Sequence, residues 1–287
     1  NHKGQGAEEY VTISGIVLDE DKHEMFVTDN DTRRMLVYNL DGKYKRSFKF
    51  QKDAMYKKIY NFDKQNLICY DFSSSNEGQS FAIISKQDGS ITQEIQIPFE
   101  EIKSIYIFLR DEANDMTYGA APYIYPIIPV SNNNWILVEP SSDTIYSYSS
   151  GYEMKPFLTR VPSIQSMNPE VFLFPSVVTD RYCFMEIVKK EYSFSTGKGF
   201  PSTFLMYDRQ EKSISRYTVN NADYSYKNIV NMVLSPQSSE VAFYHKIEPS
   251  GLVDSYKKGE LKGKLKEIAS KLDPEDNPVI MLIKHKK

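Results

Sequence analysis

Aromatic rings and basic side chains are the residues of this sequence best suited to chemistry, and they gather mainly in residues 98–122 and 189–202. Aromatic faces stack on sugar rings or clamp the side chains of a peptide, and an arginine can hold a carboxylate through two hydrogen bonds. We therefore predict a surface that binds a glycan or a peptide. Its predicted contact residues are Arg110, Tyr118, Tyr123, Arg160, Tyr192 and Lys198. For any single ring, packing beneath its own loop is the competing interpretation.

The residue patterns of common catalytic sites are missing from the sequence. The four histidines, at positions 2, 23, 245 and 285, are far apart and have no H-x-H or H-x-x-x-H companion, so zinc is not expected. There is no G-x-S-x-G elbow. The segment TGKGF (196–200) lacks the upstream glycine and the Ser or Thr after the lysine that a phosphate-binding loop needs. We expect no catalytic residues, no metal and no cofactor, and we interpret TGKGF as a hairpin tip.

Two acidic clusters, residues 19–24 and 29–32, are the remaining candidates for ion binding. Their carboxylates lack the regular spacing of oxygen ligands found in a calcium-binding loop. We therefore interpret both clusters as solvated turns.

The elements that must position these residues can be read first from residues 28–50, TDNDTRRMLVYNLDGKYKRSFKF. Side chains alternate with a period of two on both sides of Asp41–Gly42, a favoured hairpin turn, so two antiparallel strands are predicted. The upstream runs Ile13–Lys22 and His23–Asn30 add two more strands. Four strands in series form a meander.

This four-strand unit recurs along the chain. Asp88–Gly89 occupies the same turn in the second unit and Ser150–Gly151 in the third, whereas Arg209–Lys212 replaces the glycine turn in the fourth. Repeated four-stranded meanders are typical of a β-propeller, whose blades pack against their neighbours. We predict an all-β, single-domain β-propeller over residues 1–287. Its five recognisable blade units cover about residues 13–50, 55–97, 123–159, 172–218 and 229–285.

The long connections all fall on one predicted face. In a meander, the first and third turns lie at one end of the strands, and the second turn and the link to the next unit lie at the other. The long segments belong to the second group: residues 72–79, 98–122, 159–170, 189–202 and 248–277. Long loops on a rigid scaffold usually carry binding sites, so we place the predicted surface there. The competing interpretation is that insertions accumulate where folding tolerates them.

The last of these insertions contains a predicted helix over about Ser255–Leu272. Leu261, Leu265, Ile268 and Leu272 recur at helical spacing, with lysines between them. A basic amphipathic helix can bind an anionic membrane. We expect instead that its apolar stripe packs on the body of the protein.

Two segments carry a resemblance to a known family. KGQGAEEY (3–10), with the strands that follow it to residue 48, and KLDPEDNPVIMLIKHK (271–286) resemble the six-bladed, NHL-like β-propeller lipoproteins that Bacteroidetes export. The resemblance implies an exported protein, periplasmic or associated with the outer membrane, with a lipid anchor upstream of this chain and no cofactor. Most members of that family have no assigned function, so the resemblance predicts fold and compartment rather than chemistry.

The number of units differs from the six blades of that family. The last unit supplies only three predicted strands, at residues 229–234, 240–246 and 279–285, and residues 1–10 have the character of a link. We therefore expect that a first blade is missing from this chain. A gap would then lie between the first and last units.

Two functions stay open at this point. The first is a non-catalytic binding module, which we favour. The second is a metal-dependent propeller hydrolase that resembles lactonases. It would need acidic or amide side chains from different blades to meet, with Asp71, Glu139 and Glu186 as candidates.

Composition excludes some partners. The net charge of −3 argues against a broad phosphate-binding surface, so nucleic acid is not expected. No run of about 18 apolar residues is present, so no membrane span is predicted. Cys69 and Cys183 lie in apolar strand runs of different units, and we interpret them as buried free thiols.

Overall fold

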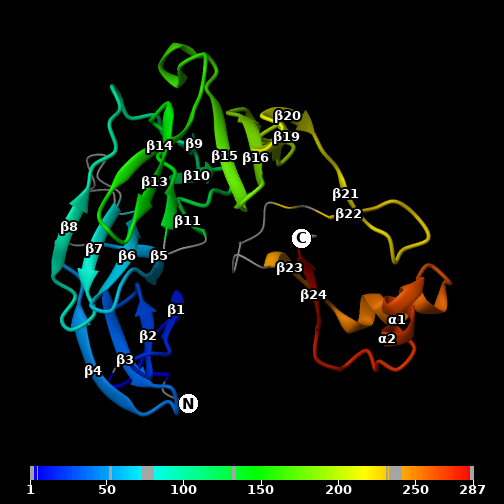
Figure 1. Cartoon of the computed structure of the whole chain (residues 1–287), viewed down its shortest axis with the longest axis horizontal. Coiled ribbons are helices and arrows are strands. Elements are labelled where there is room, and N and C mark those ends of the chain that lie inside the picture. Colours follow the sequence, from blue (N-terminus) through cyan, green and yellow to red (C-terminus); the bar gives the residue numbers. More distant parts are fainter. Residues whose placement is uncertain are drawn as a thin grey trace. The chain divides into compact units, whose positions relative to one another are not determined.

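The computed structural model describes residues 3–4, 6–51, 54–72, 81–130, 134–230, 232 and 241–284. Its elements are strands, one 3₁₀ turn (Ile164–Ser166) and two short helices (Figure 1). The chain divides into two compact units. The first holds residues 1–103 and 133–161, and the second holds residues 104–132 and 162–287.

The first unit contains two complete four-stranded antiparallel sheets with the strands in series, which confirms the predicted meander. The strands of the first sheet are β1 (Gly15–Asp19), β2 (Glu24–Asp29), β3 (Arg34–Asn39) and β4 (Tyr44–Lys49). Those of the second are β5 (Tyr56–Asn61), β6 (Asn66–Asp71), β7 (Phe81–Ser85) and β8 (Ile91–Ile95). Gly42 and Gly89 have positive φ, +82° and +72°, as the Asp-Gly turns require. Three further strands pair in order: β12 (Asn134–Leu137), β13 (Thr144–Ser149) and β14 (Met154–Thr159).

The two complete sheets share one hydrophobic core. Alternate residues of their strands point into it, and the buried members include Val17, Phe26, Met35, Val37, Tyr56, Leu67, Cys69 and Ile84. Each large side chain that is fully buried contributes about 1.5–3 kcal/mol to folding. Cys69 belongs to this core, and Cys183 is buried in the second unit. Both are free thiols, as predicted.

The turn between β13 and β14 differs from the sequence expectation. Gly151 occupies the position of the turn glycine, yet the residue in the left-handed conformation is Tyr152, with φ of +62°. A bulky side chain is strained there. The Tyr152 hydroxyl donates a hydrogen bond to Oδ2 of Asp63 at 3.2 Å, and this contact offsets part of the strain.

The second unit contains a four-stranded antiparallel sheet with the order β15-β16-β19-β20. Its strands are β15 (Val171–Val178), β16 (Tyr182–Lys189), β19 (Ser202–Asp208) and β20 (Ser213–Arg216). Within the described residues, two-stranded sheets pair β9 (Ile107–Asp111) with β10 (Met116–Ala120), β17 (Tyr192–Ser193) with β18 (Lys198–Gly199), and β21 (Val219–Asn221) with β22 (Asn228–Val230). β23 (Val241–Ile247) pairs with β24 (Val279–Lys284), and β11 (Ile127–Val130) also belongs to this unit. Parts of the strands predicted at 229–234 and 240–246, and His285, lie outside the described residues.

Two helices form where one is predicted, so the single helix over Ser255–Leu272 is wrong. α1 (Pro249–Lys257) ends before Gly259, whose φ is +71°, and α2 (Gly263–Ala269) begins after the break. The left-handed glycine interrupts the helical hydrogen bonds. The predicted packing is confirmed, because Leu261 and Leu265 are buried in a cluster with Leu252 and Ala269. Tyr224, Ile247, Leu272 and Val279 pack against this cluster, and Ile268 is half-buried.

Candidate binding surface

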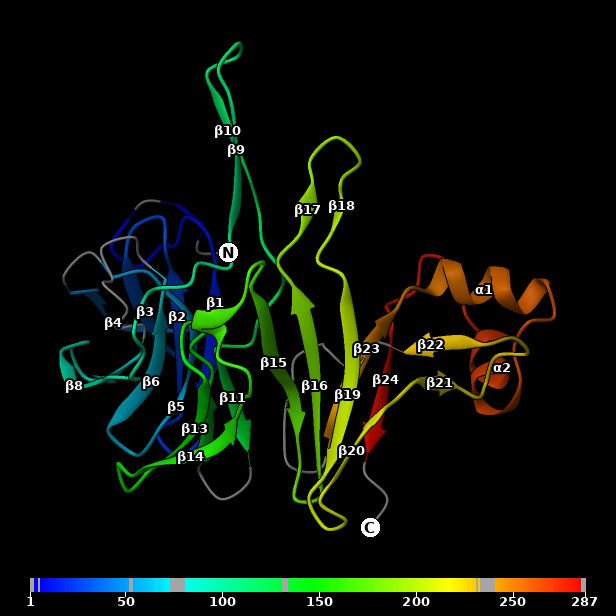
Figure 2. The ribbon, with the colours of Figure 1, turned by 90° about the horizontal axis from the view of Figure 1, so that it is seen from above.

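Residues 98–122, one of the predicted long loops, contain a hairpin. Residues 106–120, the first arm, form an antiparallel ribbon in which Leu109 lies opposite Tyr118 and Phe108 lies opposite Gly119. Figure 2 shows β9 and β10 as a ribbon, and no third strand in the part of the chain that the structure describes pairs with them. Because successive side chains of a strand point to opposite sides, the arm presents two separate faces. Both faces carry large exposed apolar side chains.

One face presents two nearly parallel rings beside a cation. The rings of Tyr106 and Phe108 are inclined by 13° with centroids 5.8 Å apart, and Phe108 is 65% exposed. Arg110, next on this face, donates to Oγ1 of Thr117 at 3.1 Å and pairs with Asp115. Exposed ring faces suit stacking on a sugar or an apolar side chain, and the guanidinium adds a donor for an acidic group.

Gly119 allows the ring of Phe108 to lie across the neighbouring strand. A β-carbon at position 119 would come within 3.2 Å of Cε1 of Phe108. Such contact is tighter than ordinary van der Waals packing, so a larger residue at position 119 would require the ring of Phe108 to shift. This glycine has no special φ, and its role is therefore spatial rather than conformational.

The opposite face of the first arm is apolar. Leu109, Met116 and Tyr118 are exposed there, and the hydroxyl of Tyr118 lies 3.8 Å from Sδ of Met116. At the tip, Oδ1 of Asp111 accepts hydrogen bonds from the backbone N–H groups of Ala113 and Asn114. The turn is thus fixed by its own side chain, while the apolar groups on both faces remain open to solvent.

Residues 189–202, the second arm, extend the hairpin between β16 and β19. Their rings contact one another: Tyr192 is 4.9 Å from Phe194 and 5.3 Å from Phe200 between centroids. The three rings are half-buried, whereas Lys198 is exposed. The prediction that TGKGF forms a hairpin tip is confirmed by the β17–β18 pairing. In this arm the competing interpretation, rings packed beneath their own loop, describes the aromatic side chains.

The remaining predicted contact residues lie in different surroundings. Tyr123 is exposed and makes an edge contact with Tyr125, with centroids 4.9 Å apart. Arg160 belongs to the first unit, where burial lowers the pKa of its guanidinium and the charge of Asp143 opposes that shift. Arg110, Tyr118, Tyr123, Tyr192 and Lys198 all belong to the second unit. The first arm holds two of the six predicted residues, Arg110 and Tyr118.

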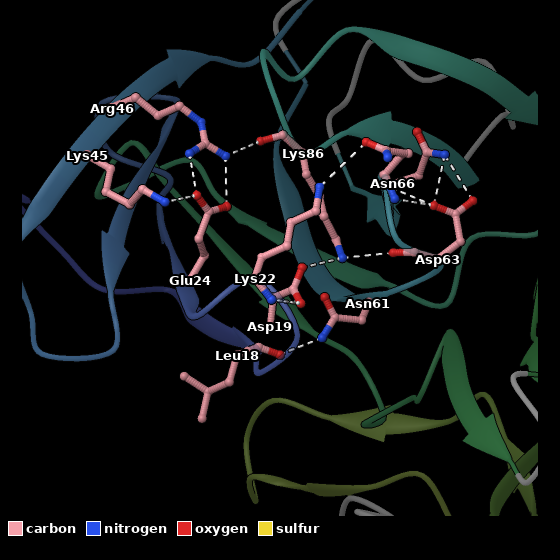
Figure 3. A network of polar contacts seen from close by, with 11 residues as sticks. Leu18, Asp19, Lys22, Glu24, Lys45, Arg46, Asn61, Asp63, Asn66 and Lys86 are labelled. Carbon is pink, nitrogen blue, oxygen red and sulfur yellow. Dashed lines mark hydrogen bonds and ion pairs between the residues drawn. The ribbon is translucent and has the colours of Figure 1, made fainter.

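A second polar assembly, for which no local sequence pattern gives a signal, joins the tight turns of the first unit (Figure 3). We call it the turn network, and its members are Asp19, Glu24, Lys45, Arg46, Asp63, Asn66, Lys86 and Tyr152. Figure 3 labels all of them except Tyr152. Arg46 donates two hydrogen bonds to Glu24, of 2.7 Å to Oε1 and 3.0 Å to Oε2. Hydrogen bonds from Arg46, with help from Lys45, lower the pKa of Glu24 from 4.5 to about 2.

Lys86 is the centre of the turn network. Its ammonium lies 2.6 Å from Oδ2 of Asp19 and 2.8 Å from the carbonyl oxygen of Asp63, and its own carbonyl oxygen accepts a 2.8 Å hydrogen bond from Arg46. The side chains of Lys86 and Asp19 are only 3% and 7% exposed. The pair therefore connects β1 with the β5–β6 and β7–β8 turns.

Asp63 carries the network toward the β13–β14 turn. It accepts hydrogen bonds from the side chains of Asn66, at 3.0 Å, and Tyr152, and from the backbone N–H of Gln65 at 2.7 Å. Burial raises the pKa of Asp63, but these hydrogen bonds outweigh burial and hold the pKa below its ordinary value. A cavity of about 590 Å³ opens beside the network and is lined by the β1–β2 and β5–β6 turns, Lys86 and Ser150. The buried charges that line this cavity, Asp19 and Lys86, already pair with each other.

The interpretation of the acidic clusters as solvated turns is wrong for three carboxylates. Asp19, Glu24 and Asp29 are all buried. Asp29 accepts a 2.8 Å hydrogen bond from the backbone N–H of Val11 and thereby holds the N-terminal segment against β2. Asp19 and its partner Lys86 are 67 residues apart in sequence, so no local pattern signals the pair.

The arrangement required by the hydrolase alternative finds no support in the described part of the chain. No group of three or more His, Cys, Asp or Glu side chains there is placed to hold a metal ion. Asp71 accepts a hydrogen bond from the backbone N–H of Met55 at 2.9 Å, and Glu139 accepts one from the backbone N–H of Ser141 at 3.1 Å.

In the described part of the chain, no helix has the length and apolar character needed to cross a membrane.

Comparisons with known proteins give a fold and a family. A "Putative exported protein" from Bacteroides fragilis has a similar structure, with a TM-score of 0.64 and 16% sequence identity, over 99% of this chain and 80% of that one. A member of the DUF4221 family from Bacteroides vulgatus gives a TM-score of 0.44 and 10% identity, over 82% and 77% of the two chains. No curated protein matches the sequence. The family described as "Domain of unknown function (DUF4934)" matches residues 1–284, and the chain belongs to that family.

Proposed function

We propose that this chain is a non-catalytic, exported binding module whose first arm recognises a glycan or a peptide. The observation that carries the proposal is the exposure of the arm. Tyr106, Phe108, Leu109, Met116 and Tyr118 are between 42% and 65% exposed on a ribbon of two strands. Apolar side chains contribute nothing to folding while they remain in water, and concentrated exposed apolar surface marks interaction sites.

The two faces of the arm suit different parts of a ligand. Tyr106 and Phe108 offer ring faces, and Arg110 lies beside them for a carboxylate or another acidic group. Tyr118 adds a ring with a hydroxyl on the other face. Tyr123, Arg160, Tyr192 and Lys198 remain proposed contact residues. Tyr192 offers less open ring surface than Tyr106 or Phe108, because two neighbouring rings already contact it.

The proposed scaffold is a six-bladed β-propeller of the NHL-like type, in which the four-stranded meanders are the blades. The repeated antiparallel sheets support this arrangement. We propose an exported protein in the periplasm or at the outer membrane, with a lipid anchor upstream. The fold shared with a "Putative exported protein" of Bacteroides fragilis is compatible with that compartment.

The experiment that tests the function is a combined glycan and peptide array with the purified chain. A ligand found on the array is then titrated against a Phe108→Ala/Tyr118→Ala variant, which truncates one ring on each face of the arm. Ile214→Ala is the matched control, because Ile214 is a similarly exposed apolar residue on β20. The proposal predicts at least a ~10-fold weaker dissociation constant for the double variant only. Binding that survives the double variant would overturn it.

A further inference from the structure

The first arm has an open edge along β10. Within the described residues, β10 pairs with β9 and with no other strand. Successive residues of an antiparallel pair direct their backbone groups alternately toward and away from the partner strand. About half of the N–H and C=O groups of Met116–Ala120 therefore point outward. Backbone groups in that position can pair with an added strand.

This edge lacks the features that protect the sheets of the first unit. The strands β4, β8 and β14 each end a sheet, and each has a register shift against its neighbour. β4 and β14 also carry lysines, and β14 contains Pro156, which cannot donate to an added strand. β10 has the sequence MTYGA, without lysine or proline, and pairs with β9 residue for residue. Because bulges, lysines and prolines keep edges unpaired, the edge of β10 is suited to pairing.

Both faces of the arm present apolar groups beside this edge. On one face, the ring of Phe108 lies against the glycine of β10, and Arg110 donates a 3.1 Å hydrogen bond to Oγ1 of Thr117. These two side chains of β9 thus extend toward β10. On the other face, Met116 and Tyr118 of β10 itself are exposed. A strand added beside β10 would contact apolar groups on both faces.

An extended peptide fits this arrangement better than a sugar does. Successive side chains of a strand point to opposite sides, so a peptide paired with β10 places side chains on both faces at once. A sugar ring stacks on one aromatic face and leaves the other face of the arm uncovered. The exposed apolar groups on both faces therefore favour the peptide among the two ligand classes.

The charge of the arm favours a basic peptide over a second copy of this chain. Residues 106–120 carry one basic side chain, an arginine, and three acidic ones, Asp111, Glu112 and Asp115. The longer segment 98–122 has the same sign of charge, with five acidic and two basic residues. Like charges on paired strands are destabilising, whereas a basic residue beside the acidic tip is attracted to it.

We propose that the first arm binds a basic, extended peptide as a third strand, paired antiparallel to the outer edge of β10. The proposal rests on the proposed binding function of the arm and narrows the ligand to a peptide. β10 runs away from the acidic tip, so the carboxyl end of an antiparallel peptide lies beside that tip. The basic residues of the peptide therefore belong at its carboxyl end. Apolar residues precede them and alternate between the Phe108 face and the Tyr118 face.

The probe is the C-terminally amidated peptide TVTIYVKK, and isothermal titration calorimetry measures its binding to the whole chain. Two further versions of the peptide carry N-methyl groups on alternate backbone nitrogens, one version on each alternate set. In a paired strand, only one set of N–H groups faces β10. One methylated version should therefore bind at least ~10-fold more weakly than TVTIYVKK, and the other should bind as TVTIYVKK does. Equal affinities of the two versions, or no binding of TVTIYVKK, would overturn the proposal.

A variant of the chain tests the same edge. Thr117→Lys gives β10 a lysine of the kind found on β4, and it should weaken the binding of TVTIYVKK at least ~10-fold. Ser215→Lys is the matched control, because Ser215 is a small, exposed polar residue on β20, which ends its sheet. Circular dichroism shows whether both variants are folded. Equal weakening by the two variants would overturn the proposal, because added positive charge alone would then matter.

The remaining outcomes separate this proposal from the proposed function. A glycan as the array ligand, without binding of TVTIYVKK, would overturn the strand pairing and leave the proposed function standing. Peptide binding that depends on one methylated set but survives Phe108→Ala/Tyr118→Ala would overturn the ring contacts and support the pairing. Self-association that Thr117→Lys abolishes would overturn the proposal, because a second copy of the chain would then occupy the edge.

Discussion

The turn network of the first unit and the first arm of the second unit reverse the usual distribution of side chains. In the turn network, charged groups such as Asp19, Glu24 and Lys86 are buried and held by partners. In the first arm, large apolar side chains lie in water. Buried charges must be paired because desolvation is costly, so the network serves the structure. Exposed rings do not stabilise the fold in this way, so the first arm is the better candidate for a ligand-binding surface.

The largest effect on stability is expected from Lys86→Met. The substitution leaves the carboxylate of Asp19 buried without its counter-ion, and the free energy of unfolding should fall by about 3–5 kcal/mol. Urea denaturation measures this change. The double variant Lys86→Met/Asp19→Leu replaces the pair by apolar groups and should recover most of the loss. A double variant as unstable as the single one would show that the two side chains do not depend on each other.

The second prediction concerns Glu24 and pH. Its pKa is about 2 in the folded protein and 4.5 ordinarily, so its ion pairs stabilise the fold fully above pH 4.5. That stability is lost as the pH falls toward 2. Glu24→Gln should lower the free energy of unfolding by about 2–3 kcal/mol at neutral pH. The difference between variant and wild type should shrink as the pH falls from 4.5 and vanish only below pH 2. A difference that does not change with pH would contradict the proposed charge effect.

A smaller effect is expected from Tyr152→Phe, which removes the hydroxyl that bonds to Asp63 but keeps the ring and the strained backbone. Loss of one hydrogen bond should lower the free energy of unfolding by about 1 kcal/mol. Ser150→Ala, in the same turn, is the control and should change stability by less than about 0.5 kcal/mol. Equal effects from both substitutions would mean that the turn, rather than the hydroxyl, matters.

The smallest effect on stability is expected in the first arm. Phe108→Ala and Tyr118→Ala each remove an exposed ring and should change the free energy of unfolding by less than about 0.5 kcal/mol. Tyr192→Ala, in the second arm, breaks two ring contacts and should cost about 0.5–1.5 kcal/mol. Thermal denaturation of the three variants compares the arms. A large loss from Phe108→Ala would show that its ring packs on the body and is not open to a ligand.

Local patterns in the sequence were sufficient to predict much of the fold. The period of two and the Asp-Gly turns predicted the meanders because both depend on residues that are close in sequence. The burial of Asp19 and Glu24 could not be predicted, because it depends on Lys86 of the β7–β8 turn and on Arg46 of β4. The helix prediction failed at Gly259, where a backbone preference overrode the regular spacing of leucines.

For the candidate site, the sequence indicated the right kind of residue but not its surroundings. Tyr106, Phe108 and Arg110 alternate in the manner of a strand, and that signal could have revealed the first arm within the supposed loop. Tyr192 and Phe108 have the same aromatic character in the sequence. Only the three-dimensional packing distinguishes a ring that contacts its neighbours from one that is open.

Among the described residues, β9 and β10 pair only with each other, and this has a consequence for handling the protein. A ribbon of two strands leaves an unpaired row of backbone N–H and C=O groups along each edge, and a second molecule can add a strand there. The carboxylates of Asp111, Glu112 and Asp115 at the tip repel the same group on another copy while they are ionised. Solutions near neutral pH and of low ionic strength should therefore keep the chain dispersed. Acidic or concentrated salt solutions should bring the ribbons together and favour precipitation.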